Sequence, residues 1–217
     1  MKPSTIKSQH MALSCYILEG TWWNHKEVPQ VLPYFQALEL TDGGIRLSHR
    51  SVRTLDDIKY WASKIPKNER AFLYFACHGE RQSLQPISGS KNAISNDVLL
   101  DALYDSTKEN AVDFLHFGCC QMIKRLNKDE SIRSYLEYSG ARWVSGYSKS
   151  VDWFKSMLLD LALLADFAIP IRYASKKKHV KISYRGQDFI NNYQALSKSL
   201  GFAGGYKSSR NGIEIFQ

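Results

Sequence analysis

The stretch AFLYFACHGE, residues 71–80, begins with a run of apolar residues and ends in a His-Gly pair. A second stretch of the same design, VDFLHFGCCQ, spans residues 112–121 and ends in two cysteines. Strands that are apolar along their whole length are typical of parallel sheets with helices on both faces. The two stretches therefore indicate buried parallel strands, each of which ends at a chemically reactive side chain.

The rest of the chain alternates between strand and helix patterns. Strands are expected at residues 13–18, 45–52, 71–79, 112–120, 141–147 and 212–217. Helices are expected at residues 31–40, 53–65, 94–110, 131–140, 150–167 and 188–200, the second capped by Thr54 and the fifth closed before Pro170. Residues 179–184 fit a strand or a loop, and the glycine-rich residues 201–212 are expected to form turns. This order predicts an α/β fold in which helices cover both faces of a mostly parallel sheet of about six strands.

Composition favours one globular domain over residues 1–217. Hydrophobic residues make up 44% of the chain and charged residues 23%, which is close to globular averages. The net charge of +8 comes from scattered lysines and arginines, and the densest cluster, residues 175–185, is expected to be a solvated loop. A nucleic-acid partner is therefore not expected.

Cysteine usage and hydropathy favour a cytoplasmic protein. The four cysteines lack the spacing of a secretory disulfide framework, and the first twenty residues lack the long apolar core of a signal peptide. The most apolar segment, residues 157–171, contains Asp160 and Asp166 and is shorter than the roughly 20 apolar residues of a membrane helix. We expect a core helix there and no membrane insertion.

His78 and Cys119 are the candidate catalytic pair. Both follow buried strands, and the carboxyl ends of neighbouring parallel strands meet at one edge of a sheet. A histidine beside a thiol can take its proton and create a strong nucleophile. Gly79, without a Cβ, would let a substrate carbonyl approach its N–H, and the N–H of Cys119 would complete an oxyanion hole. Cys77 and Cys120 are expected to be packing residues.

Three blocks together resemble a known family. FLYFACHG, VDFLHFGC and GARWVSGYSKSVDWFKS occur in this order, as do the corresponding blocks of the caspase-like (clan CD) cysteine peptidases, and the similarity is greatest to the bacterial CHAT branch. The resemblance implies a caspase-like three-layer α/β/α sandwich with His78 as base, Cys119 as nucleophile and Gly79 as oxyanion donor. In the family, a small residue comes directly before the nucleophilic cysteine. Gly118 matches that small residue, so the resemblance implies Cys119 rather than Cys120 as the nucleophile.

The third block departs from the family. Branch members often have a tryptophan near the position of Tyr147 and a second acidic residue at Trp153. In some relatives an acid near this turn binds a basic substrate side chain, a role that Asp152 could take. Alternatively, Ser150 caps the following helix and Asp152 complements its dipole.

The resemblance implies a cysteine endopeptidase that cleaves a specific protein or peptide partner, without a cofactor, in bacterial defence or programmed cell death. A separate regulatory protein would replace the sensor domain that such enzymes usually carry. Two alternatives remain. One is a catalytically inactive interaction module, and the other is a structural zinc site formed by the cysteines and His78.

Overall fold

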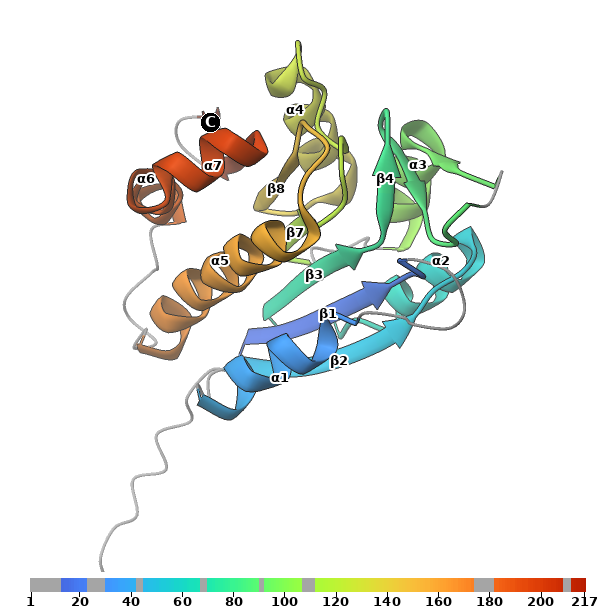
Figure 1. Ribbon diagram of the computed structural model, residues 1–217, viewed down its shortest axis with the longest axis horizontal. Coiled ribbons are helices and arrows are strands. Elements are labelled where there is room, and N and C mark those ends of the chain that lie inside the picture. The colour runs from blue at the N-terminus through green and yellow to red at the C-terminus, as the bar shows by residue number, and fades with distance from the viewer. Residues whose placement is uncertain are drawn as a thin grey trace, which may run out of the picture.

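A computed structural model describes residues 13–22, 30–41, 45–66, 70–89, 92–106, 112–173, 182–208 and 212–217 (Figure 1). Most of the basic segment 175–185 lies outside these residues. The candidate strand ends and the segments around them lie within them.

A seven-stranded sheet forms the centre, in the order β10-β9-β8-β7-β3-β1-β2. Strands β1, β2, β3, β7 and β8 are parallel to one another, whereas β9 and β10 are antiparallel additions at one edge. Their bounds are Leu13–Glu19 (β1), Ile45–Ser51 (β2), Arg70–Ala76 (β3), Phe114–Phe117 (β7), Trp143–Tyr147 (β8), Phe202–Ser208 (β9) and Gly212–Phe216 (β10). The mostly parallel sheet predicted from the sequence is therefore confirmed.

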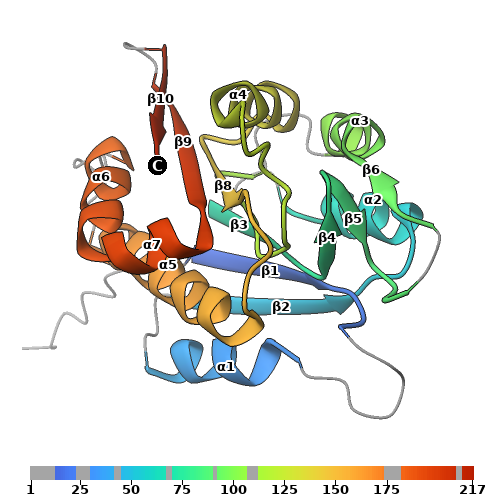
Figure 2. The ribbon, with the colours of Figure 1, turned by 45° about the horizontal axis from the view of Figure 1, so that its top comes forward.

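Helices cover both faces of the sheet (Figure 2). On one face lie α2 (Leu55–Ser63), α3 (Asn96–Ser106) and α4 (Lys128–Ser139). On the other lie α1 (Leu32–Thr41), α5 (Trp153–Tyr173), α6 (Ile182–Asn192) and α7 (Gln194–Leu200). Each face has its own hydrophobic core, so successive residues of a strand point into different cores.

Local sequence signals explain several element boundaries. Thr54 caps α2 as predicted, because its side chain accepts from the N–H of Asp57 while the Asp57 carboxylate accepts from the N–H of Thr54. Gly140 ends α4 in the left-handed conformation that favours glycine. These caps mark where α2 begins and where α4 ends.

Four predictions about the C-terminal third were wrong. The strand or loop expected at residues 179–184 fails from residue 182 onward, because α6 begins there. The glycine-rich turn prediction fails at β9, which is a buried strand. Its glycines are packing residues, since a Cβ on Gly204 would lie 2.6 Å from the Trp143 ring. Helix α5 continues past Pro170 to Tyr173, and the single helix expected at 188–200 is divided at Tyr193 into α6 and α7. Within the described residues, every helix is too short or too polar to cross a membrane.

Candidate active site

The two stretches that end in His-Gly and Cys-Cys form neighbouring parallel strands. In β3 and β7, Phe75 pairs with Phe117, and the N–H of Gly118 donates to the Phe75 carbonyl oxygen at 2.9 Å. After β3 the chain turns into a small antiparallel sheet of β4 (His78–Glu80), β5 (Ser83–Gln85) and β6 (Ile94–Ser95), which the sequence did not indicate. The predicted meeting of the two strand ends at one edge therefore occurs.

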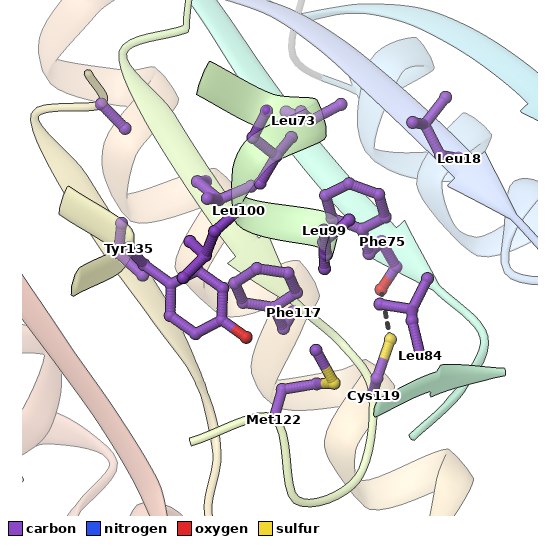
Figure 3. Packing of buried hydrophobic residues seen from close by; sticks show 14 of the residues in the cluster. Leu18, Leu73, Phe75, Leu84, Leu99, Leu100, Phe117, Cys119, Met122 and Tyr135 are labelled. Carbon is purple, nitrogen blue, oxygen red and sulfur yellow. Dashed lines mark hydrogen bonds between the residues drawn. The ribbon is translucent and has the colours of Figure 1, made fainter. Parts of the chain in front are cut away.

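The thiol of Cys119 lies in the core on the α2–α4 face. It donates to the Phe75 carbonyl oxygen at 3.3 Å, and its Sγ is 3.5 Å from the Sγ of Cys77. It is fully buried among hydrophobic side chains that include Leu84 and Met122 (Figure 3). Burial, reinforced by Cys77, raises the pKa of the Cys119 thiol well above its ordinary value. This position does not suit the nucleophile predicted at Cys119, because a buried, protonated thiol is not available to a peptide substrate.

Cys120 lies at the opposite face of the same strand end and is half-buried. Its Sγ accepts a hydrogen bond from the N–H of Val151 at 3.4 Å and donates to the Val151 carbonyl oxygen at 3.9 Å. Val151 packs against the core of the α1 and α5 face. Partial burial raises the pKa of the Cys120 thiol, so the resting group is protonated at neutral pH. The packing role predicted for Cys120 from the sequence omits these hydrogen bonds to Val151.

His78 is directed to the same face as Cys120. Its half-buried ring packs edge-on against Trp22, with ring centroids 5.5 Å apart. Trp22 belongs to the core on the α1 and α5 face, and Trp153 packs against Trp22 at 6.1 Å. The Nε2 atom of His78 contacts the Trp22 carbonyl oxygen. A histidine that donates from Nε2 keeps Nδ1 free as a proton acceptor, as a general base requires.

Trp22 is itself held by a buried carboxylate at the end of β1. Glu19 accepts from the indole N–H of Trp22 and from the N–H of Val31, each at 2.8 Å. His49 Nε2 lies 2.7 Å from the other oxygen of Glu19. Glu19 therefore fixes the segment whose carbonyl oxygen orients His78. Sequence reasoning missed Trp22, since any residue type can offer a carbonyl oxygen.

Gly79 brings the histidine segment into contact with the cysteine segment. A Cβ added to Gly79 would lie 2.2 Å from the Cys120 carbonyl oxygen and 3.0 Å from the Cys119 Cβ. Real side chains do not fit such distances, so only glycine permits this approach. The arrangement places the Gly79 backbone directly against the Cys119–Cys120 peptide.

Asp152 caps α5. Its carboxylate accepts from the N–H of Lys155 at 2.9 Å, and its carbonyl oxygen accepts from the N–H of Ser156 at 3.0 Å. The expectation that Ser150 is the cap was wrong, since Asp152 itself takes that position and Ser150 accepts from the side chain of Gln121. The Asp152 carboxylate is exposed and bound to the helix end, a structural role that explains it without a substrate pocket.

A buried polar network lies beneath the site, around Asp160 of α5. Tyr74 and Tyr147 donate to its carboxylate at 2.7 and 2.5 Å, and His116 Nε2 is 2.6 Å from Oδ1. His116 Nδ1 is 2.7 Å from the Ser145 hydroxyl. His116 is fully buried and stacks on Tyr74 in the core of the α1 and α5 face, away from the Cys119 thiol. The network ties α5, and with it the Val151 segment, to the ends of β3, β7 and β8.

In the described part of the chain, the structure contains no cluster of ligands for the zinc site considered as an alternative. No group of three or more His, Cys, Asp or Glu side chains there is placed to hold a metal ion. The thiols of Cys77 and Cys119 lie in the core on one face, whereas Cys120 and His78 lie toward the other.

Comparison with known proteins supports the fold. The sequence matches no protein-family model and no curated protein. Among solved structures, the chain is similar to a secreted C11 cysteine protease from Bacteroides thetaiotaomicron in complex with an irreversible peptide inhibitor, with 12% identity and a TM-score of 0.50. That match covers 90% of this chain and 66% of the protease, so the chain spans slightly less than two thirds of that protein's length.

A second solved structure, caspase-1 from Spodoptera frugiperda, has 12% identity and a TM-score of 0.49, with 96% of this chain and 86% of that chain covered. At such identities a similarity concerns architecture alone. The predicted α/β fold with a mostly parallel central sheet is confirmed by the sheet topology, and the C11 protease is similar to it in architecture.

Proposed function

We propose that the protein is a cysteine peptidase in which His78 and Cys120 form the catalytic dyad. One observation carries the proposal: at the shared edge of β3 and β7, His78 and Cys120 lie toward the α1 and α5 face, while Cys119 is in the opposite core. The nucleophile assigned from the sequence thus moves by one residue. Both residues lie in the turn that follows β7, and their contacts place the two thiols on opposite faces of the sheet.

The proposed reaction begins with the protonated thiol of Cys120. The Nδ1 atom of His78 takes the thiol proton as sulfur attacks the carbonyl carbon of a peptide bond. The N–H groups of Gly79 and Cys120 stabilise the oxyanion, so Cys120 replaces Cys119 as the second donor. His78 then protonates the leaving amine and later assists the water that hydrolyses the thioester. The raised pKa of the Cys120 thiol requires a general base in the first step.

The resemblance to the CHAT branch supports a finer proposal. A specific protein partner would be the substrate, and a separate regulatory protein would activate cleavage in bacterial defence or programmed cell death. The hydrogen bonds between Cys120 and Val151 are consistent with control of this kind. A regulator that moved the Val151 segment would release the thiol.

The same hydrogen bonds support the second candidate, a catalytically inactive interaction module. In that case the Val151 backbone would hold the Cys120 thiol permanently, and the site would only bind a partner. The two candidates differ in turnover, which can be measured directly.

The test is peptide cleavage by matched variants. We expect Cys120→Ala and His78→Ala to reduce kcat/KM on a cleaved peptide by at least about a thousandfold, the scale found when a catalytic nucleophile or base is removed. Cys119→Ala, the same change one residue earlier, is the control and should retain turnover. Loss of turnover in Cys119→Ala with a preserved fold, together with an active Cys120→Ala, would refute the assignment. Binding of a partner without any turnover would favour the interaction module.

A further inference from the structure

A buried carboxylate joins the edge strand β2 to the candidate site. Glu19, the last residue of β1, is 3% exposed, and His49 lies on β2, at the edge of the seven-stranded sheet (Figure 2). The strands are parallel and Ile17 pairs with His49, so Glu19 and His49 point to the same face of the sheet. This is the face toward which His78 and Cys120 lie.

The Glu19 carboxylate has contacts at both of its oxygens. Oε1 accepts from the indole N–H of Trp22 and from the N–H of Val31, each at 2.8 Å, and Oε2 lies 2.7 Å from Nε2 of His49. An ionised carboxylate only accepts hydrogen bonds, so Nε2 of His49 is the donor in the third contact. A buried charge is stable only when it is paired, and among the described residues His49 is the ion-pair partner of Glu19. His49 therefore completes the set of donors that holds this carboxylate.

The segment that follows Glu19 packs against the chain that carries His78. The N–H of Gly20 donates to the carbonyl oxygen of Ala76, the last residue of β3, at 2.9 Å. A Cβ added to Gly20 would lie 2.9 Å from the Cβ of Cys77, the residue before His78. A shift of Glu19 would therefore also displace the strand end from which the histidine projects.

Trp22 transmits the position of Glu19 to the His78 ring through two contacts. Its carbonyl oxygen contacts Nε2 of His78, and its indole packs edge-on against the His78 ring, with centroids 5.5 Å apart. The indole N–H is the group that Glu19 binds. Misplacing a catalytic group by about 1 Å can reduce the rate by about a hundredfold. The orientation of His78 thus depends on contacts that begin at His49.

We propose that His49 is a positioning residue of the candidate site, which acts through Glu19 and Trp22 to hold the His78 ring in the orientation that a general base requires. The proposal rests on the peptidase function proposed above. His49 contacts the site through Glu19 and touches no reacting atom. Its side chain is 21% exposed, so its replacement opens no large cavity in the core.

The test uses two variants with side chains of about the same length. His49→Gln keeps an N–H donor for Oε2 of Glu19, whereas His49→Met has none. Arg46→Gln removes an exposed cation from the same strand and is the control. We expect His49→Met to lower kcat by about ten- to a hundredfold with KM changed by less than about threefold, because the base is misplaced while substrate binding is retained. His49→Gln and Arg46→Gln should keep kcat within about threefold of the wild type.

A second measurement follows the His78 ring itself. Nitrogen NMR of the histidine rings should show His78 of the wild type as the tautomer with a proton on Nε2, because the Trp22 carbonyl oxygen can only accept. We expect this single tautomer to be kept in His49→Gln and lost in His49→Met. A purely structural role of His49 would lower the melting temperature of His49→Met and leave kcat and the tautomer unchanged. Should His49→Met fail to fold, His49→Asn, whose amide ends one methylene short of the glutamine amide, replaces it.

The proposed function and this inference fail separately. Cleavage that depends on Cys120, with equal kcat in His49→Met and His49→Gln, would keep the peptidase and overturn the positioning role. If the wild type cleaves no peptide, the NMR measurement decides. A His78 tautomer that changes in His49→Met and not in His49→Gln then supports the positioning role without catalysis, and the same tautomer in both variants overturns it.

Discussion

The hydroxyl of Tyr74 offers a direct test of the network that supports the site. Tyr74 is fully buried and donates to Asp160 at 2.7 Å, so Tyr74→Phe removes one hydrogen bond and leaves a carboxylate oxygen with one partner fewer. Hydrogen bonds to charged groups contribute about 1.5–3 kcal/mol, and we expect the free energy of unfolding to fall by that amount. For a chain of this size the melting temperature should fall by about 2–4 °C per kcal/mol.

Tyr135 provides a control with the same chemical change. It is also fully buried, on the other face of the sheet, and its hydroxyl has no hydrogen-bond partner among the described residues. Tyr135→Phe removes a hydroxyl without a partner there. The free energy of unfolding should therefore stay unchanged or rise by about 1–3 kcal/mol. Urea unfolding of both variants measures the difference. Equal destabilisation of Tyr74→Phe and Tyr135→Phe would refute the account of the network.

Three further outcomes are expected. Gly79→Ala should abolish cleavage and lower the melting temperature, because its Cβ would lie 2.2 Å from the Cys120 carbonyl oxygen; unchanged kcat/KM would contradict the close approach. The free energy of unfolding should fall above about pH 10. Burial, reinforced by Asp160, holds the pKa of Tyr74 and of Tyr147 well above 10 in the folded state, whereas the unfolded chain releases those protons. Urea midpoints that stay constant from pH 8 to 11 would contradict this. Alkylation of Cys120 by iodoacetamide in the absence of peptide should still be accelerating at pH 9, because partial burial raises the pKa of its thiol; a plateau near pH 7 would show a thiolate at rest.

The sequence predicted the central sheet well because its signals were local and strong. Apolar runs such as residues 71–76 and 112–117 specify strands that are buried on both faces. Parallel topology then brought His78 and the cysteine pair to one edge. The glycine-rich strand β9 was missed because its glycines are explained by the Trp143 ring, which is distant in sequence.

The sequence predicted which two chain segments meet, whereas the choice between Cys119 and Cys120 needed the structure. Matching Gly118 to a family position selected Cys119, whereas the turn after β7 places Cys120 toward the histidine face. The backbone conformation of this turn decides which thiol faces His78, and the residue pattern does not specify that conformation. The carbonyl oxygen of Trp22 belongs to a segment that is distant from His78 in the sequence and meets it only on folding.

The most direct measurement is to label the protein with a peptide-based electrophile and to locate the modified residue by mass spectrometry. The proposal predicts modification of Cys120 in the folded protein, and its loss in His78→Ala. It also predicts that Cys15, Cys77 and Cys119, which are fully buried, stay unmodified until the protein is unfolded. Modification of Cys119 in the folded protein, with Cys120 untouched, would contradict the central claim.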